Sequence, residues 1–330
     1  MPPSLAEQIG VEQLAPGRFV STALPIRVGN SLPIAYGGCA AAVAVHAACL
    51  TLPAGSALSL YSVVGHFLGP ASIDRKLYCA VTETRNTRTF ATRRVQVSQR
   101  LESGEERVCM ELVADFHADE PSSLEYSAPP SAAYPKPLDC LTPGDRVRQL
   151  RDQGLATAAQ TDVFTETFAP LGRLFETRYC PNGVSAQNLA GVLKAQPTTQ
   201  DALPITSKTS AEWQRAADAT SKPPPLSSRN EHLAALAFLM DGALSFLPLS
   251  HNRMWFDDVA ACSTLDFALR VFVPDVDLHA WMLRERVTSR AGAGRSYSEA
   301  RLWDEAGNLV ASNTQQSILR AKKGVPTSNL

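Results

Sequence analysis

The sequence predicts an α+β fold in which one unit, a long apolar helix followed by antiparallel strands, occurs twice. Residues 36–50 and 231–250 are apolar without a polar stripe, which is typical of helices that are buried on every side. After each stretch, apolar residues recur with a period of two, which is typical of strands. Short sequences recur as well, since Arg88-Thr89-Phe90 resembles Arg295-Ser296-Tyr297. These copies lie about 200 residues apart and indicate an internal duplication.

The first unit begins with an expected strand at residues 18–26, which precedes the helix at 36–50. That helix opens with Gly37 and Gly38, and paired glycines at a helix start let a ligand or another backbone approach the free N–H groups. Further strands are expected at residues 59–67, 76–84, 89–98 and 107–116. Polar, turn-like sequences separate these strands and predict an antiparallel meander.

A proline-rich segment separates the two units. Proline, serine and alanine dominate residues 119–143, which is typical of a linker. We therefore expect an N-terminal domain over residues 1–118, a linker over residues 119–160 with a short helix at 145–158, and a C-terminal domain over residues 161–330.

The second unit repeats the order of elements of the first. Its central helix at 231–250 is expected to end at Pro248, because proline cannot continue a helix. Strands are expected before this helix at 173–180 and 211–216, and after it at 262–273, 279–287, 296–304 and 309–319.

The composition, with 45% apolar and 19% charged residues, is that of an ordinary globular protein. A formal net charge of −1 gives no electrostatic reason to bind nucleic acid, and no apolar run is long enough to span a membrane. Seven scattered cysteines without a CxxC pair, and no signal peptide, predict an intracellular protein without a disulfide framework. Ser328-Asn329-Leu330 loosely resembles the peroxisomal Ser-Lys-Leu signal, so both cytoplasm and peroxisome stay open.

Asp241 is a carboxylate inside the apolar stretch 231–250. Its helical neighbours Phe238 and Leu244 are apolar, so no solvated face explains it. A buried carboxylate is paired, hydrogen-bonded or protonated, and such groups cluster at functional sites. The alternative is that Asp241 reaches solvent where the helix ends.

Familiar catalytic motifs are missing from the sequence. It contains no GxSxG elbow, HExxH, Walker loop or GxGxxG. The six histidines show no metal-ligand spacing, so no metal site is expected. His66 lies in the strand expected at 59–67, where it either lines a cleft or packs against a neighbour.

The order of these features resembles the double hotdog fold and, specifically, the acyl-coenzyme A thioesterase II family. In the first unit the resemblance rests on Tyr36-Gly37-Gly38, on Phe67-Leu68-Gly69-Pro70 and on the run from Arg88 to Val95. In the second unit it rests on Met240-Asp241 with Phe246-Leu247-Pro248, on Ser263-Thr264-Leu265-Asp266, and on Leu309-Val310-Ala311-Ser312 followed by Gln315. The resemblance implies two antiparallel sheets that each wrap a long central helix.

The resemblance also implies a hydrolytic trio of Asp241, Thr264 and Gln315. The implied substrate is an acyl-CoA or an acyl-carrier thioester, with no cofactor and no metal, and we also expect a homo-oligomer. The candidates for substrate binding are Gly37, Gly38, His66, Arg94 and Arg295. Two positions depart from the family pattern and leave the acyl-chain specificity open: Cys39 replaces a common Gln, and Phe267 replaces a common His.

The chemistry of thioester hydrolysis suits these residue types. Hydrolysis needs a positioned water, a group that takes its proton, and donors for the developing oxyanion. In apolar surroundings Asp241 can act as the base, while Thr264 and Gln315 fix the water. Two alternatives stay open: a pathway enzyme of the same fold that releases, cyclises or dehydrates a thioester-bound polyketide or lipid intermediate, and a non-catalytic acyl-binding protein.

Overall fold

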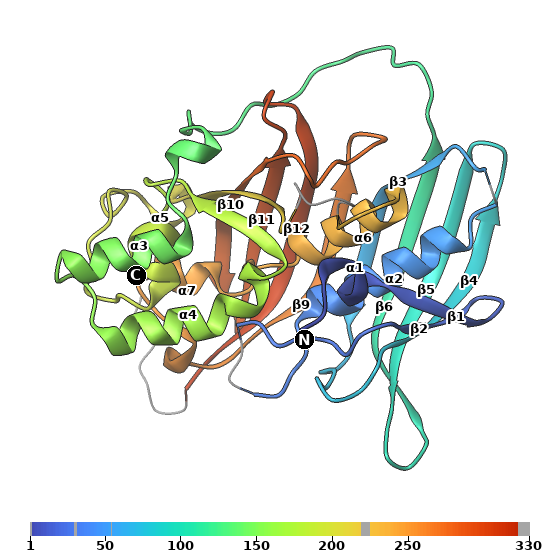
Figure 1. Cartoon of the computed structure of the whole chain (residues 1–330), viewed down its shortest axis with the longest axis horizontal. Helices are drawn as coiled ribbons and strands as arrows, with labels where there is room; N and C mark the ends of the chain where they lie inside the picture. The colour runs from blue at the N-terminus through green and yellow to red at the C-terminus, as the bar shows by residue number, and fades with distance from the viewer. Residues whose placement is uncertain (1, 30–31, 54, 219–224, 323–330) are drawn as a thin grey trace.

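One continuous antiparallel sheet forms the frame of the molecule (Figure 1), which a computed structural model describes for residues 2–29, 32–53, 55–218 and 225–322. The first half contributes β1 (Val11–Ala15), β2 (Arg18–Ser21), β3 (Leu58–Phe67), β4 (Tyr78–Asn86), β5 (Phe90–Arg100) and β6 (Glu106–Ala118). The second half contributes β7 (Phe175–Tyr179), β8 (Ser210–Ala216), β9 (Val259–Val271), β10 (Met282–Gly292), β11 (Arg295–Trp303) and β12 (Leu309–Ala321). Each predicted strand is therefore present, although its ends differ by a few residues.

The two expected sheets are joined edge to edge. The strand order is β1-β2-β4-β5-β6-β3-β9-β12-β11-β10-β8-β7, so β3 of the first half pairs with β9 of the second. Their register runs from Ser62 opposite Arg270 to His66 opposite Asp266. This pairing removes one open edge from each half of the sheet.

Two central helices, α2 (Gly37–Leu50) and α6 (Arg229–Met240), lie side by side against one face of the sheet (Figure 1). They run in opposite directions, because Gly38 at the start of α2 approaches Phe238 near the end of α6. Helix α2 is apolar and buried over almost its whole length, and α6 is apolar and buried from Leu233 to Met240. Residues of both halves thus share one hydrophobic core.

The predicted helix at 231–250 is broken in two. A capping box formed by Ser228 and Glu231 opens α6, which ends at Met240, and a separate helix α7 covers Leu247–His251. Between them Ala243 adopts a φ of 71°, which a continuous helix excludes. Pro248 lies in the first turn of α7 and does not end the central helix.

The proline-rich segment is attached to the sheet of the second half. The Trp303 and Trp213 indoles donate hydrogen bonds to the carbonyls of Ala128 and Pro135, and Ser131 donates to Glu285. Helix α3 (Pro143–Asp152) follows and is capped by Thr142. The domain boundaries at residues 118 and 160 stay predictions.

The remaining helices are short or cover the second half. They are α1 (Leu5–Ile9), α4 (Ala158–Gly172) and α5 (Val184–Gln187), none of which the sequence patterns predict. Among the described residues, no helix is long and apolar enough to cross a membrane. All seven cysteines are free. Ser328-Asn329-Leu330 lies outside the described residues.

Candidate active site

Asp241 lies immediately after the last residue of α6, where the chain turns away from the helix axis. Its side chain is mostly buried, although not completely. Gln315, from the inner face of β12, donates from Nε2 to the Asp241 carboxylate at 2.8 Å. The same amide group faces the backbone carbonyl of Asp241 at 3.3 Å. One carboxylate oxygen of Asp241 is therefore fixed by Gln315.

Thr264 completes a chain of hydrogen bonds. Its hydroxyl, on β9, donates to Oε1 of Gln315 at 3.0 Å. Gln315 is fully buried, and its two amide ends face different partners. Strands β9 and β12 are adjacent, and a bulge near Thr264 shifts their register. The structure thus brings the three residues of the expected trio, Asp241, Thr264 and Gln315, together.

The glycine pair at the start of α2 faces Asp241 from the other half of the chain. A Cβ atom at Gly37 would lie 2.9 Å from Oδ2 of Asp241, and one at Gly38 would lie 2.6 Å from the Phe238 carbonyl oxygen. Only glycine fits such an approach. The Cys39 N–H donates to the Tyr36 carbonyl at 3.0 Å, and the Gly38 N–H donates to the Asp241 carboxylate, so the start of α2 lies against an acidic group that the helix dipole favours.

The surroundings perturb the protonation of Asp241. Burial raises the pKa of its carboxyl group to about 6, and this shift is offset in part by the Gln315 amide, the Gly38 backbone amide and Arg284. An ionised carboxylate with a pKa near neutrality is a suitable general base. Burial also raises the pKa of the neighbouring Cys39 to about 12, so this thiol stays protonated.

Aromatic side chains pack around the glycine pair. The Phe67 ring would lie 2.8 Å from a Cβ atom at Gly37, and its centroid is 5.8 Å from that of Phe267. Phe267 is buried and leaves no room for a side chain at Gly65. The departure from the family pattern at residue 267 therefore adds an apolar ring.

Three predicted substrate-binding residues lie elsewhere. Neighbours on a strand point to opposite faces, so His66 and Arg94 lie outside while Phe67 and Arg93 point to the core. Arg94 pairs with Glu111 on that outer face, and Arg295 is exposed at the β10–β11 turn. The structure does not bring His66, Arg94 or Arg295 to Asp241.

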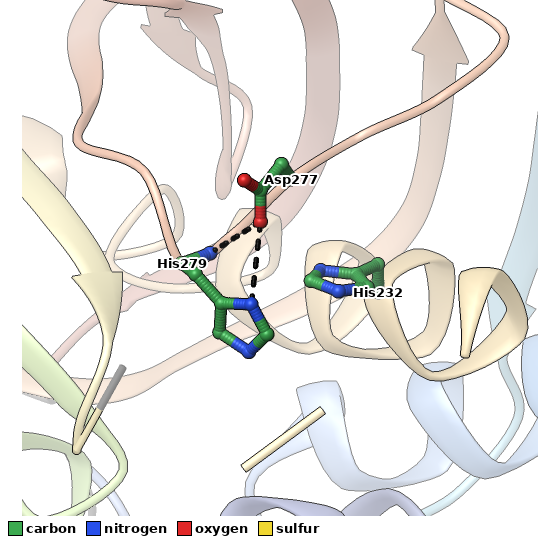
Figure 2. Close-up of side chains that lie close together, drawn as sticks. All are labelled: His232, Asp277 and His279. Carbon is green, nitrogen blue, oxygen red and sulfur yellow. Dashed lines mark hydrogen bonds and ion pairs between the residues drawn. The ribbon is translucent and has the colours of Figure 1, made fainter. Parts of the chain in front are cut away.

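One group of side chains has the composition of a metal site (Figure 2). His232, Asp277 and His279 place ligand atoms within 4.8 Å of one another. However, His232 Nδ1 accepts the Leu278 backbone N–H, and His279 Nε2 accepts that of Leu226. Each neutral ring then carries its hydrogen on the remaining nitrogen, so neither ring offers a free lone pair. These contacts fit a structural tie between α6 and the β9–β10 loop better than a metal site.

Two domain families match the chain. The acyl-CoA thioesterase C-terminal domain matches residues 153–319, and the acyl-CoA thioesterase N-terminal domain matches residues 25–117. The chain belongs to the acyl-CoA thioesterase family. It is therefore a thioester hydrolase, and the family implies an acyl-CoA thioester as substrate.

Solved structures support the fold of this thioesterase. The acyl-CoA thioesterase II TesB2 of Mycobacterium marinum is 20% identical with a TM-score of 0.66, over 97% of this chain and 100% of that one. A tesB protein of Mycobacterium avium subs paratuberculosis is 16% identical with a TM-score of 0.67, over 96% and 97% of the two chains. A conserved protein with a hot dog fold from Alicyclobacillus acidocaldarius is 16% identical with a TM-score of 0.64, over 96% and 98%. No curated protein matches the chain.

Proposed function

We propose that this chain hydrolyses an acyl-CoA thioester with a water molecule that Asp241 activates. The observation that carries this proposal is the hydrogen-bonded chain Thr264–Gln315–Asp241, which faces the start of α2. Gln315 occupies one oxygen of the carboxylate and leaves Oδ2 toward Gly37. The Gly38 backbone amide also donates to this carboxylate, which keeps lone pairs that can accept a proton from water.

In the proposed reaction the water oxygen bonds to the thioester carbonyl carbon while the water proton passes to Asp241. The negative charge that develops on the carbonyl oxygen is met by backbone N–H groups at the start of α2, where the helix dipole favours an anion. The carbon–sulfur bond then breaks, and the proton leaves Asp241 for the thiolate sulfur. The products are a free acid and a thiol.

Thr264 and Gln315 are proposed to orient the groups that react. The Thr264 hydroxyl donates to Gln315, so its oxygen keeps lone pairs that can accept a hydrogen bond from the water. Gln315 holds the Asp241 carboxylate in one orientation. The apolar rings of Phe67 and Phe267 beside Gly37 and Gly65 suit an acyl chain.

A dehydratase of the same fold, considered above, requires a histidine next to the aspartate. His46 contacts the Ile9 carbonyl, His251 contacts Ser210, and His66 lies on the outer face of the sheet. His117, His232 and His279 contact Glu120, the Leu278 amide and the Leu226 amide. The contacts of these six side chains therefore favour hydrolysis.

A panel of acyl-CoA thioesters of increasing chain length, assayed by release of free thiol, tests this proposal. The same acyl groups on an acyl carrier protein distinguish the two thioester sources. We expect thiol release from the wild type and its loss in Asp241→Asn, which keeps the size of the side chain. Binding of a non-hydrolysable acyl-CoA analogue by the inactive variant would show that the site is intact. Unchanged turnover in Asp241→Asn would reject the assignment, and binding without any thiol release by the wild type would favour the acyl-binding alternative.

A further inference from the structure

The segment that carries Asp241 is held by side chains from other elements. The last carbonyl groups of a helix have no partner inside the helix. Here the carbonyls of residues 238–242 each accept a side-chain donor. The donors are Tyr36 Oη to Phe238 at 2.7 Å, Arg284 Nη1 to Leu239 at 2.6 Å, Asn313 Nδ2 to Met240 at 2.9 Å, Gln315 Nε2 to Asp241 at 3.3 Å, and Arg284 Nη1 to Gly242 at 3.3 Å.

Arg284 contacts this segment on both sides of Asp241. Its Nη1 atom bonds to the carbonyl of Leu239 before the aspartate and to that of Gly242 after it. The Arg284 side chain is only 2% exposed. A Cβ atom at Gly242 would lie 3.2 Å from Nη1, so the glycine lets the guanidinium approach the backbone.

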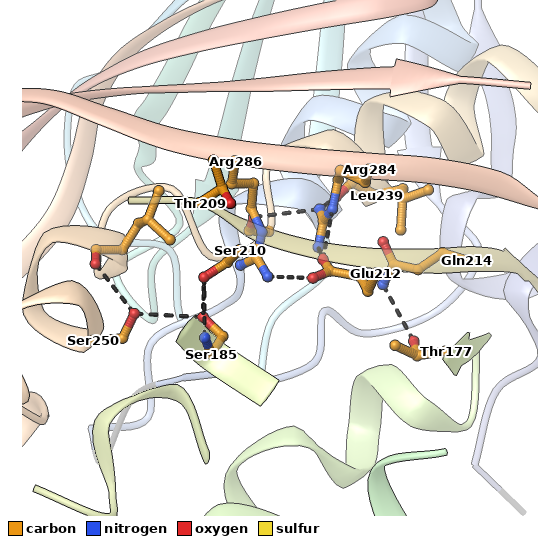
Figure 3. A network of polar contacts seen from close by, with 12 residues as sticks. Thr177, Ser185, Thr209, Ser210, Glu212, Gln214, Leu239, Ser250, Arg284 and Arg286 are labelled. Carbon is orange, nitrogen blue, oxygen red and sulfur yellow. Dashed lines mark hydrogen bonds and ion pairs between the residues drawn. The ribbon is translucent and has the colours of Figure 1, made fainter. Parts of the chain in front are cut away.

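Arg284 is itself fixed by a buried carboxylate (Figure 3). Glu212 on β8 lies directly opposite Arg284 on β10 in the sheet. Glu212 Oε1 accepts from Nε of Arg284 at 3.0 Å and from Nη2 at 2.7 Å. The second oxygen of Glu212 accepts from Arg286, which makes no contact with the end of α6 among the described hydrogen bonds. Two donors from one arginine on a carboxylate restrict the orientation of the guanidinium.

We propose that Arg284, oriented by Glu212, is a positioning residue that holds Asp241 in its reactive orientation from both sides. This inference rests on the proposed role of Asp241. A misplacement of about 1 Å can lower a rate about a hundredfold, so a group that fixes the backbone on either side of the base affects turnover without touching substrate.

The charge of Arg284 also acts on Asp241. A cation at the C-terminal end of a helix is favoured by the helix dipole. Burial raises the pKa of Asp241, and Arg284 is one of the groups that lower it again. The other titratable groups that face Arg284 or Asp241 are Tyr36 just before α2, Cys39 of α2, Tyr179 of β7, Glu212 of β8 and Arg286 of β10. Removing the Arg284 charge should therefore raise the pKa of Asp241.

Arg284→Gln and Arg284→Lys test the proposal, with Arg286→Gln as the matched control. Arg286 lies two residues along the same strand, is buried and contacts the same carboxylate, but it does not reach α6. We expect Arg284→Gln to lower kcat at least about tenfold with little change in KM. The acid limb of its pH profile should move upward by up to about one unit. Arg284→Lys keeps the charge, so the acid limb of its pH profile should stay close to its position in the wild type.

The control separates positioning from stability. Arg286→Gln should lower the unfolding temperature as much as Arg284→Gln while kcat and the acid limb stay at wild-type values. Equal losses of kcat in both variants, or an unmoved acid limb in Arg284→Gln, would overturn the inference. If Arg284→Gln does not fold, a kcat in Arg284→Lys equal to the wild type would overturn it as well. Asp241→Asn is assayed in parallel. If Asp241→Asn is inactive and Arg284→Gln has wild-type activity, the inference about Arg284 is rejected and the proposed function stands. If Asp241→Asn is active, both the proposed function and the inference about Arg284 are rejected.

Discussion

The C-terminal ends of the two central helices carry different side chains, although a buried arginine contacts each of them. At the end of α2, Arg93 on β5 donates to the hydroxyl and to the carbonyl of Thr51. At the end of α6, Arg284 on β10 donates to the carbonyls on both sides of Asp241. Arg93 is completely buried and Arg284 nearly so.

The comparison separates what supports the fold from what supports the reaction. Both arginines satisfy carbonyls that a helix leaves without partners. At the end of α6 lie in addition the Asp241 carboxylate, the Gln315 amide from β12 and the Thr264 hydroxyl from β9. This end faces Gly37 and Gly38 of the first half. Both helix ends are therefore supported by an arginine, although the two arginines come from strands at different places in the repeat, and we expect a reactive group at one end only.

The largest expected difference lies between Asp241→Asn and Thr51→Ala. General bases contribute about 10²–10⁴-fold to a rate, so Asp241→Asn should lose activity by that factor. Thr51→Ala removes a hydroxyl that accepts from Arg93 and donates to the Ala48 carbonyl, and it should cost about 1–3 kcal/mol of unfolding free energy without changing kcat. Steady-state thiol release and chemical denaturation measure the two effects. A comparable loss of kcat in both variants would mean that both helix ends carry catalytic groups.

Gly38→Ala should disturb the contact between the two halves. The new Cβ atom would lie 2.3 Å from the Tyr36 ring and 2.6 Å from the Phe238 carbonyl oxygen, so one of the helices must move. Overpacking of this kind costs about 1–3 kcal/mol. Gly69→Ala is the matched control, because a Cβ atom there meets nothing within 4 Å. Thermal unfolding and kcat of the two variants compare the effects, and equal stability would contradict the expected clash.

Asp241→Asn should stabilise the fold at neutral pH. The folded-state pKa of Asp241, about 6, lies above the ordinary value of 3.8, so the folded protein loses stability relative to the unfolded chain as the pH rises between these values. The variant lacks this loss and should gain about 3 kcal/mol above pH 7, with no gain below about pH 4. Urea denaturation at several pH values measures the difference. A gain that does not depend on pH would exclude the carboxyl group as its cause.

The pH profile of turnover gives the smallest expected effect. The proposed role of Asp241 as a base requires its ionised form, so kcat/KM should rise with pH through about 6. Gln315→Leu removes a hydrogen bond that lowers the pKa of Asp241, and its acid limb should move upward. Gln316→Leu, on the opposite face of β12, is the control and should leave the limb in place. A limb in Gln315→Leu that coincides with the wild type would contradict the role of this amide.

Much of the fold follows from local patterns in the sequence. The strand period of two and the two apolar helices predicted eleven of the twelve strands in the described residues and the two central helices, because burial on one face or on all faces leaves a local pattern of apolar residues, whereas α1, α4, α5 and α7 were not predicted. The same reasoning marks Asp241, which is the carboxylate inside an apolar stretch. Its grouping with Thr264 and Gln315 came from the family resemblance, and the structure brings these residues together.

Local patterns did not determine which face of a strand points to the site. His66 and Arg94 lie one residue away from the inward-pointing Phe67 and Arg93, and a shift of one residue reverses the face. The break of the second helix at Met240 was also missed, because the donors that meet this helix end come from Tyr36, β10 and β12, far away in the sequence. Arg284 and Asn313 are distant from Asp241 in sequence and carry no pattern that links them to it.

The amino-acid sequence by itself determined the duplicated order of elements and the presence of a carboxylate in apolar surroundings, since both depend on neighbours a few positions apart. Only the tertiary structure decided that Gly37 and Gly38 of the first half face Asp241 of the second, and that β3 and β9 join the halves into one sheet. Such contacts depend on pairing across some 200 residues of chain, which the alternation of polar and apolar residues does not encode.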